Sequence, residues 1–253
     1  MDCAIALDPG LARAHVLRGW LHFFTCTNGT VDFGTAMRAT EADFRAVALD
    51  PNDAEAHAAL GFYDGQVGRL AESEVEVRAA LAANPADTHV LGIAAATLPY
   101  LGYPNEAARH ADKALRLDPN MAPADLTSLK DAYYFARRFD DTLRVIARIP
   151  PEFRSYGSLL LQAAGLAMLG RAEDETARVR AAMLARDPKM STELLVGRDW
   201  QFARQQERDL FIAGIRKAGL PVCAHEEDIA AVPVSKRLPG CEAERAEAAA
   251  PRT

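Results

Sequence analysis

The chain has 253 residues, of which 49% are hydrophobic and 25% charged, so it carries enough apolar material for a core and is not disordered as a whole. Its formal net charge of -6 argues against a nucleic-acid-binding surface, since such surfaces are usually basic. No apolar run approaches the roughly 20 residues that a membrane span needs, and the N-terminus does not resemble a secretory signal. We therefore expect a cytoplasmic protein with neither a nucleic acid nor a membrane as partner.

An internal repeat runs through the first 190 residues. Short apolar stretches end in Asp-Pro or Asn-Pro, and the marker prolines are Pro9, Pro51, Pro85, Pro119 and Pro188. The first three intervals are 42, 34 and 34 residues (51 − 9, 85 − 51, 119 − 85), so the period is 34 with an eight-residue excess in the first unit. A fixed period of this size predicts a repeat architecture of helix pairs.

The first elements in chain order are a remnant and two repeats. Residues 1–10 resemble the end of a second helix whose first helix is absent, which indicates that the chain derives from something longer. The next unit contains an insertion at about 25–33, and the unit at about 54–87 is the most regular, with Gly68 placed 17 residues before its proline. A small residue, here Ser73, follows five positions later and should let two helices cross closely.

The later repeats change character. The third keeps Gly102, whereas the fourth carries Arg137 where glycine is expected and stops early at Pro150. The fifth keeps Gly170 and Pro188 and closes the array at about residue 190. Beyond a linker, residues 205–220 have the pattern of an amphipathic capping helix within a 191–221 segment.

The last stretch, residues 222–253, is rich in proline, alanine and charge, so we expect it to be disordered and dispensable for folding. The four cysteines, Cys3, Cys26, Cys223 and Cys241, form no CxxC pair and show no regular spacing. A disulfide framework or a zinc ribbon would need closer grouping, so we expect free thiols in a reducing compartment.

These landmarks resemble those of the tetratricopeptide (TPR) family, a 34-residue helix-turn-helix repeat. The resemblance covers roughly residues 1–190 and implies an all-α, right-handed superhelical solenoid of five helix pairs plus the C-terminal capping helix. It also implies that the first helix of each pair lines a concave groove for a protein or peptide partner.

Aligning the repeats places a set of candidate partner-binding residues on that groove. They are Arg13, Trp20 and Phe23 from repeat 1, Glu55, Phe62 and Gln66 from repeat 2, His89, Ala96 and Tyr100 from repeat 3, and Asp131 and Tyr134 from repeat 4. The alternative is that Trp20 and Phe62 pack between helices. The exposed N-terminal edge of the array is a further candidate surface, for self-association.

A closer resemblance rests on three features together: the insertion at Thr25–Phe33, the shortened fourth unit, and the closing sequence from Phe211 to Pro221. That combination is similar to the C-terminal TPR region of bacterial class III adenylate/guanylate cyclases, where it implies a regulatory role in signal transduction. Alternatives are the TPR tail of a winged-helix transcriptional regulator and a stand-alone adaptor.

No motif for catalysis is present. The chain lacks the phosphate loop GxxxxGK[ST], the GxGxxG dinucleotide fingerprint, HExxH and GxSxG. Its histidines and acidic pairs lack metal-ligand spacing. We therefore predict a non-catalytic interaction module with no catalytic residue, no cofactor and no metal.

Overall fold

The computed structural model describes residues 2–27, 38–42, 44, 52–171, 173–186, 188–194, 201–230, 232–233 and 237–249. Within these ranges the regular elements are helices, and no strand occurs. Most of the predicted insertion, residues 28–33, lies outside the described residues, as does the landmark Gly34.

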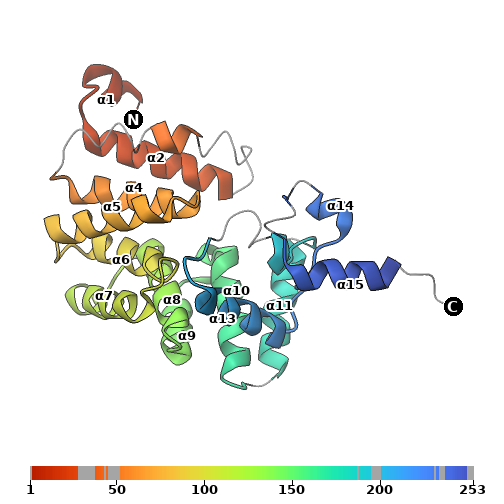
Figure 1. Ribbon diagram of the computed structural model, residues 1–253. Helices are drawn as coiled ribbons and strands as arrows, with labels where there is room; N and C mark the ends of the chain where they lie inside the picture. The colour runs from red at the N-terminus through yellow and green to blue at the C-terminus, as the bar shows by residue number, and fades with distance from the viewer. Residues whose placement is uncertain are drawn as a thin grey trace.

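The described helices of the array stack in adjacent pairs (Figure 1). A short α1 (Asp2–Leu7) precedes α2 (Ala12–Thr27), whose partner helix is described only at 38–42 and 44. The next pairs are α4 (Ala54–Gln66) with α5 (Leu70–Ala83), α6 (Thr88–Thr97) with α7 (Pro104–Leu117), α8 (Pro123–Phe135) with α9 (Phe139–Ala147), and α10 (Tyr156–Met168) with α11 (Glu173–Arg186). The first helices also contact one another from α4 to α10, which confirms the predicted all-α repeat solenoid.

Small residues let the two helices of a pair cross closely, as the sequence predicts. The Ser73 hydroxyl on α5 donates to the carbonyl of Gly61 on α4 at 2.6 Å. A Cβ atom added to Gly61 would lie 2.8 Å from a methyl of Val77, so only glycine fits the crossing. The equivalent small residues of the next two pairs, Ala107 and Thr142, are fully buried.

The turns within the pairs α4/α5, α6/α7, α8/α9 and α10/α11 each contain a left-handed residue. Gly68, Gly102 and Gly170 adopt φ values of +84°, +89° and +66°. In the fourth repeat Arg137 takes the same conformation, with φ 61°, at the position where the others have glycine. Helix α9 ends at Ala147, before Pro150, and a 3-10 turn at Pro151–Phe153 leads into α10. The sequence correctly identified the fourth repeat as irregular.

Basic side chains in or just after α7, α9 and α11 tie each of these helices to the backbone of the segment before its own pair. Lys113 donates to the carbonyl of Pro85 at 2.6 Å, and Arg148 donates to that of Pro119 at 2.6 Å. Arg186 repeats this contact on the carbonyl of Arg154 at 2.8 Å. These carbonyls follow the ends of helices, where backbone acceptors lack intrahelical partners.

The predicted amphipathic helix forms as α13 (Gln205–Lys217) and ends before Gly219, whose φ is +69°. Its expected apolar residues Leu210, Phe211 and Ile215 are buried. The helix packs chiefly on α10 and reaches α8, so it crosses the first helices of the last two pairs (Figure 1).

The described parts of 222–253 are ordered, whereas the sequence composition predicts disorder there. The described part contains α14 (Glu226–Ile229) and α15 (Pro239–Ala249), and Ile229, Val232 and Leu238 are buried. A small number of apolar residues does not exclude an ordered structure here, because a disulfide and ion pairs add to the apolar contacts.

The prediction of free thiols is wrong for two of the four cysteines. Cys223 and Cys241 form a disulfide across a sequence separation of 18 residues, whereas Cys3 is free and exposed. Spacing alone could not reveal this pair, because a disulfide depends on how the chain returns in space and not on a motif. The disulfide also removes the cysteine-based argument for a reducing, cytoplasmic location.

Candidate functional site: the first-helix face

We use the term first-helix face for the surface made by α2, α4, α6, α8 and α10, where the predicted partner-binding residues lie. The structure divides these residues into two groups. Those on α2, α4 and the start of α6 remain partly exposed, whereas those from repeat 4 are buried. The side chain of Phe23 lies outside what the structure describes.

We call the partly exposed part of this face, on α2, α4 and the start of α6, the open half. An aromatic cluster lies at its centre and forms what we call its floor. The ring of Trp20 lies 5.3 Å from that of Phe62 and 5.2 Å from that of Phe44. The imidazole of His89 meets the same indole ring edge-on, with centroids 6.4 Å apart. Trp20 and Phe62 both keep part of their surface exposed, so they pack between helices and also face the surface.

Polar side chains flank this floor. Arg13, whose side chain is 75% exposed, lies 3.7 Å from the carboxylate of Glu55. Nδ1 of His89 lies 3.4 Å from an oxygen of Asp125, so α6 and α8 are bridged next to the cluster. Gln66 is partly exposed near the end of α4. An apolar centre with a polar rim is typical of surfaces that bind proteins.

The other half of the face, from the end of α6 to α10, has buried side chains, and we call it the closed half. The Tyr100 hydroxyl donates to Oδ1 of Asp131 at 2.7 Å, and Nζ of Lys130 donates to Oδ2 at 2.7 Å. Lys130, Asp131 and Tyr134 are 7%, 5% and 0% exposed. Burial, together with the Asp131 carboxylate, raises the pKa of Tyr100 well above its ordinary value. Asp131 and Tyr134 are thus buried, so neither side chain is open to a partner in this arrangement.

The chain's own residues 201–217 cover this half. The backbone N–H of Ala203 donates to the carbonyl of Tyr100 at 2.8 Å, and the guanidinium of Arg204 lies 5.3 Å from the ring centre of Tyr103. The Tyr134 hydroxyl reaches the carbonyl of Leu210 at 3.5 Å. The segment therefore sits on the first helices in the way a bound peptide would.

Two aromatic anchors hold this segment. Phe202 packs against Tyr100 and Phe135 at 5.3 and 5.7 Å between ring centroids. Phe211, fully buried, stacks on Phe135 at 6.3 Å. Phe202, Lys130 and Phe135 were missed by sequence reasoning. The only available signal was the apolar face of residues 205–220, which predicted a helix that needs a partner but not the surface that it covers.

No group of three or more His, Cys, Asp or Glu side chains in the described ranges is placed to hold a metal ion. None of the helices in the described part of the chain has the length and apolar character that crossing a membrane requires.

The sequence matches no family model and no curated protein. Among solved structures, one titled "Functional Characterization of Pseudomonas Aeruginosa pilF" is similar to this chain at 18% identity, covering 72% of this chain and 94% of that one, with a TM-score of 0.31. A likeness this loose carries no argument about function. The description of the chain as an all-helical repeat solenoid therefore rests on its own helix pairs and turns.

Proposed function

We propose that the chain is a non-catalytic protein-interaction module that binds an extended or helical peptide of a partner protein on the open half of its first-helix face. The binding surface is the Trp20–Phe62 floor with its flanking pairs, Arg13–Glu55 and His89–Asp125. Amphipathic aromatic side chains and arginine are favoured anchors at such surfaces.

One observation carries the proposal. The closed half of the same face already holds a peptide-like segment, residues 201–217, through two phenylalanines and a backbone hydrogen bond. The open half offers the same kind of helices with its aromatic floor partly exposed. A surface that accommodates an aromatic-anchored segment at one end is suited to take another at the other end.

A displayed library of random peptides, selected on the purified chain, tests this proposal. Selected peptides should lose about fivefold or more in affinity on His89→Ala, since an interface residue that matters for binding contributes over about 1 kcal/mol. Arg13→Ala, at a more exposed rim position, should lose less.

Val75→Ala is the matched control, because Val75 is 66% exposed on α5, a second helix. Peptides that bind the Arg13, His89 and Val75 variants equally well would contradict the placement of the binding surface. Circular dichroism of each variant checks that the fold is intact.

Self-association is a second candidate function at the N-terminal edge. Leu7, Leu11, Leu17 and Leu21 are between 41% and 88% exposed on and between α1 and α2, an apolar strip on the edge of the array. A Leu17→Glu/Leu21→Glu variant should shift the sedimentation coefficient toward the monomer if this edge pairs two copies. An unchanged value would exclude the pairing.

The finer assignment, to the TPR region of a bacterial nucleotide cyclase, is supported only by the sequence resemblance of the insertion, the short fourth repeat and the Phe211–Pro221 closing sequence. A winged-helix regulator or a stand-alone adaptor are the other contexts for such a module. The DNA directly upstream of this reading frame distinguishes them by encoding a cyclase domain, a DNA-binding domain or neither.

A further inference from the structure

The end of the chain forms a small unit that the repeat pattern does not account for. We call the described residues 188–194, 221–230, 232–233 and 237–249 together the C-terminal subdomain. Backbone N–H groups of Thr192 and Glu193 donate to the carbonyls of Pro221 and Val222, at 3.1 and 2.9 Å. These two bonds are among those that join its two pieces.

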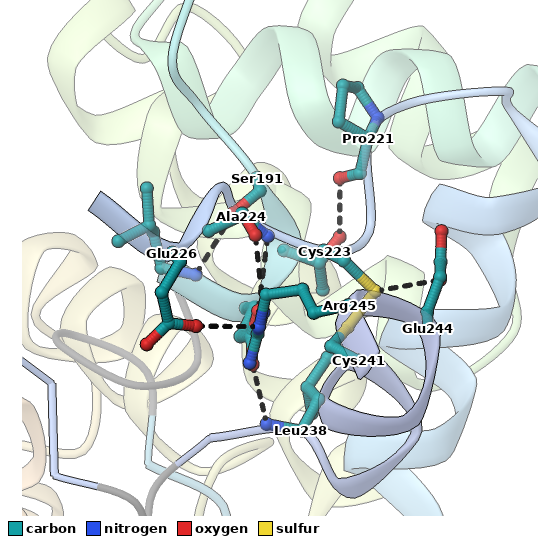
Figure 2. The surroundings of a disulfide bond; sticks show 12 residues. Ser191, Pro221, Cys223, Ala224, Glu226, Leu238, Cys241, Glu244 and Arg245 are labelled. Carbon is teal, nitrogen blue, oxygen red and sulfur yellow. Dashed lines mark hydrogen bonds and ion pairs between the residues drawn. A yellow bond between two sulfur atoms is a disulfide. The ribbon is translucent and has the colours of Figure 1, made fainter. Parts of the chain in front are cut away.

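The buried carboxylate of Glu193 organises the subdomain, and Figure 2 labels its partners Ala224, Leu238 and Arg245. Glu193 is 0% exposed, and its oxygens accept from the backbone N–H groups of Ala224 at 3.1 Å and Leu238 at 3.2 Å. Arg245 on α15 donates to both oxygens, at 2.6 and 3.1 Å. A buried charge is tolerated only when it is paired and hydrogen-bonded in this way.

The disulfide closes the same unit. Cys223 precedes α14, and Cys241 lies in the first turn of α15 (Figure 2). The bond therefore ties both ends of the loop that carries Ala224 and Leu238, the two backbone donors to Glu193. Cys241 is fully buried, whereas Cys223 keeps part of its surface exposed.

The apolar content of the subdomain is too small to order it alone. Its own apolar cluster consists of Leu194, Ala224, Ile229 and Val232. Units below about 40 residues seldom bury enough surface to offset the entropy of ordering the chain, and they usually depend on disulfides or metals. Closing a loop of this length raises the folding equilibrium constant by a factor on the order of one hundred.

The subdomain covers the end of the repeat array. Leu238 and Cys241 belong to the same apolar cluster as Val179 and Met183 of α11 and Leu220, which follows α13. If the subdomain loosens, this end of the array becomes accessible to water and to other chains.

We propose that the C-terminal subdomain is a redox-sensitive cover of the array's end, ordered when Cys223 and Cys241 are joined and released when they are reduced. The reductant is a dithiol. One of its thiolates attacks the sulfur of Cys223 and displaces the Cys241 thiolate, which takes up a proton. The second thiol then resolves the mixed disulfide, so two electrons and two protons pass to the chain and the dithiol becomes a cyclic disulfide.

Hydrogen exchange of the full chain, oxidised and after treatment with dithiothreitol, tests this. Reduction should accelerate amide exchange across 221–230 and 237–249 by at least tenfold, with less than a twofold change in α5 and α7. A Cys223→Ser/Cys241→Ser variant without reductant should reproduce the reduced pattern. Cys3→Ser, at the free exposed cysteine, should behave as the unmodified chain in both states.

Equal exchange of the oxidised and reduced chains in these two segments would overturn the proposal. Titration of four free thiols in the purified, denatured, non-reduced chain would also overturn it, because the disulfide would then not exist. If the double serine variant does not fold, the comparison of the oxidised and reduced unmodified chain still decides the outcome.

Discussion

The two halves of the first-helix face are built from equivalent helices but present different surfaces. On α2 and α4, Trp20 and Phe62 remain partly exposed, whereas on α8 Tyr134 is completely buried. The difference comes from residues 201–217, which return along the array and cover α10 and part of α8. A position in a repeat thus predicts which face a side chain lies on, but not whether another segment of the chain covers it.

The largest expected effect comes from uncovering the closed half. Phe211→Ala removes a fully buried ring that contacts Phe135 and Phe202, and truncation of such a side chain costs about 3–5 kcal/mol. In a repeat array the loss should fall on the neighbouring repeats first. Hydrogen exchange should therefore lose protection across 158–186 while α4 to α7 keep theirs.

Phe153→Ala is the control, since Phe153 is 64% exposed and its loss should change stability by less than about 0.5 kcal/mol. Unchanged protection across 158–186 in Phe211→Ala would show that α13 does not support the last helix pair.

The next effect concerns the ion pair between Glu193 and Arg245 in the C-terminal subdomain. Glu193→Ala removes the acceptor of two backbone N–H groups and the buried carboxylate partner of Arg245, which should cost about 3 kcal/mol in the C-terminal subdomain. Glu193→Gln keeps the shape and one acceptor, so it should cost less. Differential scanning calorimetry measures both, and equal melting temperatures for all three chains would contradict the role of Glu193.

A smaller effect is expected at the left-handed turn residue, which is glycine in the regular repeats and Arg137 in the irregular fourth repeat. Arg137→Gly relieves a left-handed backbone at a non-glycine residue and should stabilise the chain by about 0.5–1 kcal/mol. Gly170→Ala is the converse, because φ is +66° there and an added Cβ would meet no atom within 4 Å, so backbone strain alone acts. Urea unfolding should move in opposite directions for the two variants; a shift of both in the same direction would contradict the argument.

The smallest effect is the pH dependence of the stability that comes from an ion pair between α5 and α7. A hydrogen bond from Arg78 lowers the pKa of Glu106 below its ordinary value of 4.5, although partial burial opposes this. Because the folded pKa is lowered, the contribution to stability is complete above pH 4.5 and is lost as the pH falls through the folded value. The side chains are partly exposed, so we expect less than about 1 kcal/mol.

Glu106→Gln should therefore unfold more easily than the unmodified chain at pH 7, with the gap narrowing below pH 4.5. A gap that stays constant down to pH 2 would exclude the ion pair as its source.

Much of the array could be predicted from the sequence because its signals are local. Glycine landmarks and small residues such as Ser73 each act within one helix pair, and the described pairs have them in those roles. The covering of Tyr134 and the pairing of Cys223 with Cys241 depend on how distant segments return in space. No periodicity encodes such contacts, so the closed half of the face and the C-terminal subdomain needed the structure.

The division of the first-helix face is tested most directly by hydroxyl-radical footprinting of the chain, free and bound to a peptide selected from a displayed library. We predict that Trp20 and Phe62 react in the free chain and become protected by the peptide, while Tyr134 and Phe211 stay unreactive in both states. Protection absent at Trp20 and Phe62, or reactivity gained at Tyr134 and Phe211 on binding, would show that the peptide does not use the open half and would contradict the account.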